Sequence, residues 1–193
     1  MQQRGAELLV IGLLISGCSN PFALREAENP NVPVWWRDLK TPENVLANLE
    51  DIYDLGAASY IGSLLTDDYV FVPDRQDVVD VGLAGGDTLS SLEEIASTRA
   101  IEENVSGSVQ LEFFDEDVNT SADTVTVKWN YDLALSSLPL AGIEEPVTAT
   151  GEAVYRMRRD PDTRDWRIYL WRDHPGDTEW SWGRIKLEAL ANG

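Results

Sequence analysis

The 193-residue sequence contains one cysteine, Cys18, and one histidine, His174. No internal disulfide can form, and a zinc site or a serine–histidine–aspartate triad would depend on a single imidazole without a histidine or thiolate partner. Basic residues are also scarce, because 15 Lys and Arg face 34 Asp and Glu, which gives a formal net charge of −19. This charge repels phosphate backbones, so nucleic acid is excluded as a partner. We expect no metal ion and no other cofactor.

The N-terminal apolar stretch is too short to cross a membrane as a helix. It runs over the eight residues Leu8–Ile15, whereas a transmembrane helix needs about 20 residues. Arg4 precedes the stretch and the small pair Ser16 and Gly17 follows it. A charged start, an apolar centre and a small-residue end are typical of an export signal.

The sequence ISGC at residues 15–18 resembles the lipobox of bacterial lipoproteins, in which a peptidase cuts before a lipid-modified cysteine. The resemblance implies a signal peptide over residues 1–17 and a lipid anchor on Cys18. A plain secretory signal and a buried first strand are the alternatives. An anchored chain belongs to the cell envelope, and Ser19 implies an outer-membrane location facing the periplasm where the host has two membranes.

Residues 18–40 are expected to form the lipidated cysteine and an extended tether. Three prolines fall between residues 19 and 34, and no helical periodicity is present there. Trp35 and Trp36 close the tether, and we expect both to pack onto the domain rather than enter the membrane interface. The domain itself is expected to span residues 41–193.

Helical signals dominate the first part of this domain. Thr41 suits an N-cap, Pro42 the first helical position and Gly56 the C-terminal end. The apolar stripe of this helix consists of Val45, Leu46, Leu49, Ile52 and Tyr53.

The following segments alternate between helical, turn and strand signals. A short helix is expected from Tyr60 to Leu65, and Asp67 and Asp68 are expected in the turn before a strand over residues 69–72. Residues 75–87 are polar and glycine-rich, which predicts a loop. A further helix, which reaches about Glu103, is expected from the capping-box spacing of Ser90 and Glu93.

Apolar and polar residues then alternate with a period of two, which predicts strands over residues 109–113, 125–135, 147–158 and 166–171. A tight turn at residues 160–162 joins the last two. Helices followed by antiparallel strands indicate an α+β fold. In the last strand, the alternation places Trp166, Ile168 and Leu170 on one face, and on the other Arg167, Tyr169, Trp171 and Asp173.

Two segments resemble the NTF2-like family, which includes ketosteroid isomerases, SnoaL-like cyclases and many bacterial lipoproteins. They are residues 41–73 (TPENVLANLEDIYDLGAASYIGSLLTDDYVFVP) and residues 166–186 (WRIYLWRDHPGDTEWSWGRIK). The resemblance implies a cone, in which a bent antiparallel sheet wraps round the N-terminal helices and leaves a cavity at its open end. Trp180, Trp182 and Ile185 are expected to fold the C-terminal segment over the cone. The side chains expected to line the cavity are Tyr53, Trp129, Tyr131, Tyr155 and Trp166.

The resemblance also implies candidate catalytic residues. Tyr53 could serve as the phenol, and Asp67 or Asp68 as the base, of an isomerase or dehydratase. Each also has a structural interpretation, because Tyr53 lies on an apolar stripe and the two aspartates follow a helix end. The strand position that would supply a second acid falls among residues without a carboxylate: Trp129, Tyr131 and Leu133.

Two further patterns are interpreted as structural. His174 is expected to be a surface turn residue or a hydrogen-bond partner of Asp173. The alternating oxygens of residues 115–123 resemble a calcium loop, but Thr120 and Thr126 stand where that loop needs glycine and glutamate. A solvated hairpin loop is expected there.

The leading hypothesis is a membrane-anchored, non-catalytic NTF2-like lipoprotein that binds a small apolar ligand or a protein partner. One alternative is an isomerase- or dehydratase-type enzyme that uses Tyr53 with Asp67 or Asp68. Another is an envelope assembly subunit without a ligand. Tyr169 and Trp171, set among charged residues on the outer face of the sheet, predict a homodimer.

Overall fold

In the computed structural model, the described residues are 32–82, 87–105 and 107–193. The predicted signal peptide, Cys18 and the first part of the predicted tether lie outside these ranges. A compact unit spans Trp35–Gly193. Its helices are α1 (Pro42–Asp54), the 3-10 turn η1 (Ala58–Tyr60), α2 (Ile61–Leu64), α3 (Arg75–Val81), α4 (Ser91–Asn104), the 3-10 turn η2 (Pro139–Ala141) and α5 (Trp182–Asn192).

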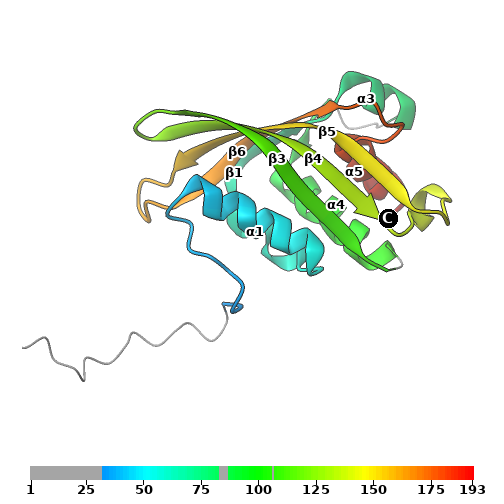
Figure 1. The fold of residues 1–193 in the computed structure, drawn as a ribbon, viewed down its shortest axis with the longest axis horizontal. Coiled ribbons are helices and arrows are strands. Elements are labelled where there is room, and N and C mark those ends of the chain that lie inside the picture. The colour runs from blue at the N-terminus through cyan, green and yellow to red at the C-terminus, as the bar shows by residue number, and fades with distance from the viewer. Residues whose placement is uncertain (1–31, 83–86, 106) are drawn as a thin grey trace, which may run out of the picture. The chain divides into compact units, whose positions relative to one another are not determined.

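The strands of the described ranges form one sheet in the order β2-β1-β6-β5-β4-β3. Neighbouring strands are antiparallel except β1 and β6, which are parallel. Figure 1 shows the sheet bent over α1, α4 and α5, which lie on one side of it. The expected α+β fold class, with a bent sheet round helices, is confirmed. The strands are β1 (Leu65–Val72), β2 (Leu89–Ser90), β3 (Val109–Thr120), β4 (Thr124–Leu135), β5 (Val147–Arg159) and β6 (Trp166–Pro175).

The capping signals fix the ends of the two longest helices. The Thr41 hydroxyl accepts the N–H of Asn44 at 3.2 Å, and Gly56 has a φ of +60° just after α1. Ser90 and Glu93 form the expected capping box, in which each side chain accepts the backbone N–H of the other residue. These short side chains satisfy N–H groups that the first helical turn leaves free.

Residues 35–40, which the sequence assigned to the tether, pack against the domain. Trp35 and Trp36 both contact the ring of Tyr60, with centroid distances of 5.6 and 5.7 Å. Leu39 is buried, and its carbonyl accepts the N–H of Trp166 at 2.7 Å. The expected packing of the two tryptophans onto the domain is confirmed.

The prediction of a loop over residues 75–87 was wrong for its first half, which forms α3. The Asp74 side chain caps this helix by accepting the N–H of Gln76 at 2.8 Å, and Gly82 ends it with a φ of +74°. Asp67 and Asp68 also differ from expectation, because β1 begins at Leu65 and contains both of them. α3 is only seven residues long. A segment of this length contains too few turns for a helical period to be distinguished from the pattern of a loop.

An irregularity in β6 corrects the predicted faces of that strand. Arg156 pairs with Leu170 but Met157 pairs with Ile168, so Tyr169 is an extra residue in β6. A bulge of this kind moves every side chain beyond it to the opposite face of the sheet. As a result Trp171 and Asp173, predicted on the outer face, are buried on the inner face.

The hairpin of β3 and β4 is longer than predicted. β3 continues to Thr120, with a register shift between Phe114 and Asp117, so the turn begins at Ser121. Most of the calcium-like sequence is therefore strand rather than loop. In a strand, side chains at alternate positions lie along one face about 6.7 Å apart. Oxygens spaced in this way cannot surround one ion.

Candidate functional site

The C-terminal helix fills the interior of the cone. The ring of Trp182 lies between the rings of Trp171, Tyr53 and Tyr131, at centroid distances of 4.4, 5.0 and 5.2 Å. Trp182 and Ile185 are fully buried, so the expected folding of this segment over the cone is confirmed for both. The part of the interior around Trp182, where the sequence predicts a cavity, is filled by side chains.

Polar groups of the sheet hold the first turn of α5. The backbone N–H of Trp182 donates to the Tyr131 hydroxyl at 2.9 Å, and that of Gly183 donates to Asp173 at 2.7 Å. Tyr131 reaches this position across Gly151, where a Cβ would lie 2.7 Å from its hydroxyl oxygen. These groups replace the hydrogen-bond partners that a helix N-terminus lacks within itself.

A buried ion pair lies next to Trp182. The Lys186 ammonium donates to Glu94 Oε1 at 2.5 Å, and both side chains are fully buried. The other oxygen of Glu94 accepts the Tyr69 hydroxyl at 3.1 Å. Burial lowers the pKa of Lys186 to about 8. Burial also raises the pKa of Asp173, which accepts the N–H of Gly183 in the first turn of α5, to about 6.

The buried phenols are unable to act as bases near neutral pH. Burial raises the pKa of Tyr53, Tyr69, Tyr131 and Tyr155 above the usual value for tyrosine, so all four stay protonated. The Tyr53 hydroxyl accepts the indole N–H of Trp182 at 3.2 Å and lies 3.4 Å from the Thr98 hydroxyl. A protonated Tyr53 can still donate a hydrogen bond, which is the role of the phenol in the predicted catalytic set.

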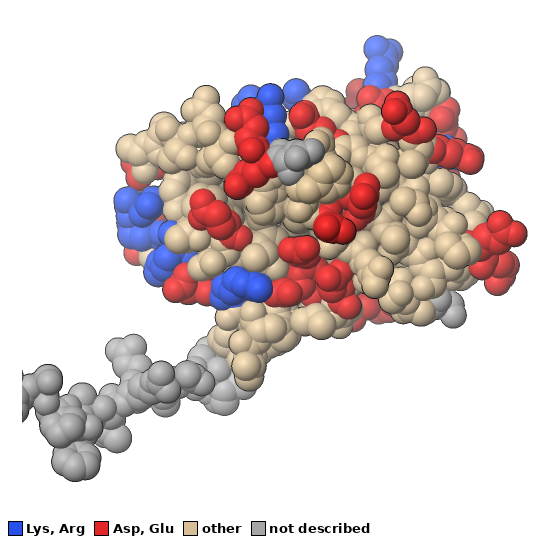
Figure 2. Space-filling view, viewed as in Figure 1, with Lys and Arg blue, Asp and Glu red and all other residues tan. Residues whose placement is uncertain are grey.

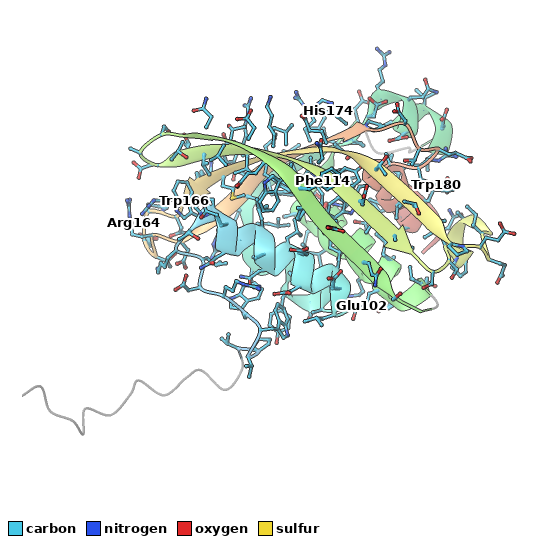
Figure 3. All side chains as sticks on the ribbon, in the orientation of Figure 1. Glu102, Phe114, Arg164, Trp166, His174 and Trp180 are labelled. Atoms are coloured by element: carbon cyan, nitrogen blue, oxygen red, sulfur yellow. The ribbon has the colours of Figure 1, made fainter. Side chains whose placement is uncertain are left out.

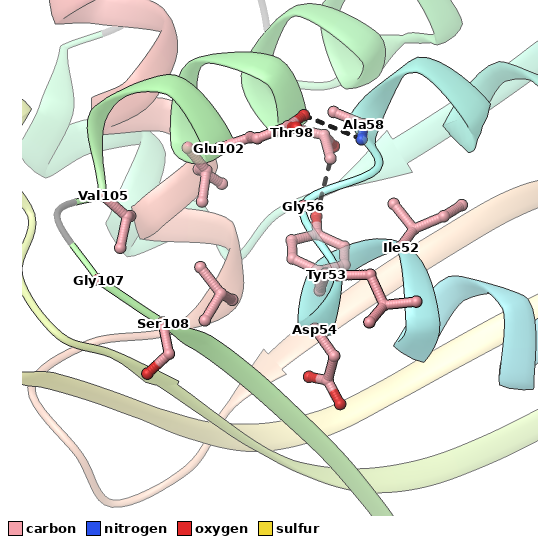
Figure 4. Close-up of a pocket in the computed structure, with 13 residues that line it drawn as sticks. Ile52, Tyr53, Asp54, Gly56, Ala58, Thr98, Glu102, Val105, Gly107 and Ser108 are labelled. Atoms are coloured by element: carbon pink, nitrogen blue, oxygen red, sulfur yellow. Dashed lines mark hydrogen bonds between the residues drawn. The ribbon is translucent and has the colours of Figure 1, made fainter.

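A cavity of about 200 Å³ remains between the C-terminal ends of α1 and α4 and the start of β3. Figure 4 shows Tyr53 and Thr98 meeting in its wall, with Glu102 above them and Asp54 below. Glu102 accepts the N–H of Ala58 at 3.0 Å, and Asp54 accepts the N–H of Leu111 at 2.8 Å. The lining residues are Ile52, Tyr53, Asp54, Leu55, Gly56, Ala58, Thr98, Ile101, Glu102, Val105, Gly107, Ser108 and Val109.

The structure separates the residues predicted as a catalytic set. Tyr53 borders the cavity, whereas Asp67 and Asp68 are exposed on β1. Asp68 pairs with Arg158 on the outer side of the sheet. Tyr53 and the two aspartates therefore do not converge on a common point.

Only Tyr53, of the five residues predicted to line a cavity, borders this one. Tyr131 and Tyr155 are buried in the cone beside Trp182 and Trp171. The ring of Trp129 packs on Phe113 at a centroid distance of 4.8 Å. Trp166 is buried at the start of β6, under the guanidinium of Arg159.

Two buried carboxylates and one buried ammonium were not predicted from the sequence as members of a site. Glu94 follows directly after the capping-box residue Glu93. Asp173 was predicted on the outer face because the bulge at Tyr169 was not foreseen. Lys186 lies within the C-terminal segment that was expected only to cover the cone. A single lysine opposite a distant glutamate leaves no pattern that sequence reasoning can detect.

His174 is exposed near the end of β6, in agreement with a surface position, and Figure 3 shows it on the side of the sheet away from α1. Across the described ranges, no group of three or more His, Cys, Asp or Glu side chains is arranged to hold a metal ion. None of the helices described there is both long and apolar enough to span a bilayer.

Comparison with known proteins identifies the fold. The sequence matches no protein-family model and no curated protein. An NTF2-like protein from Streptomyces avermitilis, provisionally assigned as a dehydratase, aligns with a TM-score of 0.54 at 18% identity, over 72% of this chain and 96% of that one. The chain has an NTF2-like fold.

Two further solved structures align over a similar part of the chain. An NTF2-like superfamily protein from Salmonella enterica has a TM-score of 0.52 at 10% identity, over 70% of this chain and 89% of that one. A Mycobacterium tuberculosis protein of unknown function has a TM-score of 0.57 at 13% identity, over 78% and 85% of the two chains. At these identities, the likeness shows the NTF2-like fold and not a shared activity.

Proposed function

We propose that this NTF2-like domain is a non-catalytic binding module, which takes a small apolar ligand in the cavity beside Tyr53. The filling of the cone by Trp182 and Lys186 is the observation that supports it most directly. An isomerase or dehydratase needs an acid or base beside its substrate. The carboxylates at this cavity, Asp54 and Glu102, are each engaged by a backbone N–H.

The cavity sets the chemistry of the ligand. Its volume of about 200 Å³ lies below the roughly 300–1,000 Å³ of drug-sized pockets, so the ligand must be compact. Six of the thirteen lining residues are aliphatic, namely Ile52, Leu55, Ala58, Ile101, Val105 and Val109. Among the polar lining residues, Asp54 and Glu102 already accept backbone N–H groups. The neighbouring hydroxyls of Tyr53 and Thr98, 3.4 Å apart, are therefore the point at which a ligand hydroxyl can bond. A single ring or short branched chain with one hydroxyl group fits this arrangement.

Thermal-shift titration with phenol, cyclohexanol and benzene tests the proposal. We expect the two hydroxyl-bearing probes to raise the melting temperature, since ligand binding to the folded state alone stabilises it. Val105→Phe, which fills the cavity, should abolish the rise, whereas Val79→Phe on the exposed side of α3 should leave it intact. No rise with any probe, or an equal rise in Val105→Phe, would refute binding at this cavity.

We also propose that Cys18 carries a lipid that holds the domain at the envelope membrane. The order of Arg4, Leu8–Ile15 and the ISGC sequence supports this location. The outer-membrane face toward the periplasm follows from Ser19 in a host with two membranes. Intact mass measurement of the membrane-extracted protein should find a chain that begins at Cys18 and carries acyl groups.

The outer face of the sheet is basic at one end and acidic at the other. This charge distribution supports a homodimer as the assembled form. The strand register brings Arg156 and Arg158 of β5 next to Lys128, Arg167 and Arg172. Farther along the same face it brings together Glu112, Asp132 and Glu152. A two-fold axis across such a face sets the basic end of one copy against the acidic end of the other.

The outer-face dimer would use side chains that have no ion-pair partner in the monomer. Within the described residues, Arg156, Lys128 and Arg172 form no salt bridge. Tyr169 stays on this face under the guanidinium of Arg158, 5.4 Å away, whereas Trp171 does not contribute. We therefore propose pairing through charges and Tyr169.

A further inference from the structure

The ammonium group of Lys186 lies in an aromatic cage. Its nitrogen is 3.3 Å from the ring centroid of Trp171, 4.3 Å from that of Phe71 and 5.3 Å from that of Trp182. Glu94 completes the enclosure with a hydrogen bond of 2.5 Å. No part of the lysine or glutamate side chain is exposed.

The composition of this cage matches the needs of a primary ammonium. Such a group has three N–H donors, and here Glu94 Oε1 accepts one of them. The faces of Trp171 and Phe71 carry partial negative charge and attract the remaining positive surface. Aromatic faces also recognise quaternary ammonium ligands. The carboxylate of Glu94 favours a primary ammonium here, because a quaternary one has no N–H to donate.

Most of the cage exists independently of the helix that carries Lys186. Phe71 comes from β1, Trp171 from β6 and Glu94 from α4, and only Trp182 shares α5 with the lysine. The Phe71 and Trp171 rings fix each other edge to face at 5.2 Å. The Tyr69 hydroxyl fixes the second oxygen of Glu94.

An ordinary packing role does not account for this choice of residue. A buried ammonium loses its hydration, and an apolar side chain of similar volume would fill the same space without that loss. Nearby polar groups also remain without hydrogen-bond partners in the described structure, namely Tyr155 Oη, Trp171 Nε1 and Asp173 Oδ1. The interior thus contains more polar atoms than its internal hydrogen bonds use.

We propose that the interior of the cone is a recognition site for a primary alkylammonium group, and that Lys186 occupies it as a ligand supplied by the chain itself. The site is distinct from the cavity beside Tyr53 and does not depend on a ligand there. It also defines what an external ligand must be. A molecule that enters the cone in place of the lysine side chain needs a primary amine on an unbranched alkyl stem.

Replacement of the lysine by an added amine tests the proposal. Lys186→Ala removes three methylene groups and the ammonium, which together correspond to n-propylammonium. Titration of the full-length variant with n-propylammonium chloride should raise its melting temperature by roughly 3–6 °C at ten times the dissociation constant. If the variant does not fold alone, the same titration is followed as recovery of near-ultraviolet circular dichroism.

Matched controls separate ammonium recognition from cavity filling. 1-Propanol and tetramethylammonium should have no comparable effect, because the first lacks charge and the second lacks N–H donors. Lys186→Met, which fills the cage, should not respond to n-propylammonium. Glu94→Gln in the Lys186→Ala background should weaken the amine at least tenfold, and Val105→Phe in that background should leave its effect unchanged.

Two results would overturn the proposal. One is a titration in which n-propylammonium neither stabilises nor refolds Lys186→Ala. The other is a response of this variant to 1-propanol that equals its response to n-propylammonium. Both are independent of phenol or cyclohexanol binding. Failure here and failure of the proposed cavity ligand can therefore be told apart.

Discussion

At the scale of single residues, the interior of the cone depends on charges that are fully enclosed. Glu94→Gln removes the counter-charge of Lys186 and leaves a buried ammonium without compensation. We expect a loss of about 3–5 kcal/mol in the free energy of unfolding, measured in urea. The double variant Glu94→Gln with Lys186→Met should recover most of that loss. Equal losses in the single and double variants would contradict this account.

Asp173 gives stability a definite pH dependence. Burial raises its pKa from 3.8 to about 6 in the folded state, so the folded protein binds the proton more tightly than the unfolded chain. Stability contributed by this residue is therefore fully present below pH 3.8 and is lost as pH rises to about 6, by roughly 3 kcal/mol. The difference in unfolding free energy between wild type and Asp173→Asn, followed from pH 4 to 7, should change in that direction.

At the scale of elements, Trp182 is the largest of the fully buried side chains of α5. Trp182→Ala removes a fully buried indole that contacts rings from α1, β4 and β6. We expect a loss of about 3–5 kcal/mol from the resulting cavity. The half-buried Trp180, whose ring lies under Arg184, is the matched control and should cost less than about 1.5 kcal/mol as Trp180→Ala. Denaturant unfolding of both variants checks the contrast.

Elements whose ends are set by local chemistry could be predicted from the sequence. Thr41 with Pro42 and Ser90 with Glu93 gave the starts of α1 and α4, because an N-cap acts over only three residues. The extra residue Tyr169 in β6 could not be predicted, since a bulge is decided by pairing with β5. That one residue accounts for the misplacement of Asp173 and hence for part of the missed site.

The candidate site itself was only partly predictable. Tyr53 was found because the first helix has a clear apolar stripe and the fold resemblance gives that position a role. The partners of Tyr53 come from α4 and α5, and nothing local in the sequence brings Thr98 or Trp182 to it. Contacts between residues 45 and 129 positions apart are a property of the folded chain.

At the scale of the whole molecule, the charge distribution makes the proposed dimer testable. Figure 2 shows Asp and Glu spread over the visible face, with Lys and Arg mainly at its left and upper margins. In the proposed two-fold arrangement the basic half, with Arg156, faces the acidic half, with Asp132. Arg156→Glu should therefore shift the sedimentation coefficient toward that of the monomer.

The reversed pair is the decisive control for this dimer. Arg156→Glu combined with Asp132→Arg exchanges the two signs and should restore association. Arg75→Glu, an exposed change on α3, should have no effect. A wild-type domain that sediments as a monomer at every accessible concentration would rule the dimer out.

The anchor makes a separate prediction for the whole chain. Cys18→Ser removes the sulfur that the lipid would modify, so the protein should move from the membrane fraction to the soluble fraction. Cell fractionation with immunoblotting measures this shift. An unchanged membrane fraction would contradict lipid attachment at Cys18.

The position of α5 after the strands in the sequence has a consequence for biosynthesis. The ribosome makes Trp182 and Lys186 only after every strand of the sheet is complete. Until then the nascent chain lacks both the indole that closes the cone and the cation that neutralises Glu94, so the interior is completed only when α5 is added. A chain that ends shortly before residue 182 would therefore leave Glu94 without its cation and the rings of Tyr53, Tyr131 and Trp171 without the indole that packs between them.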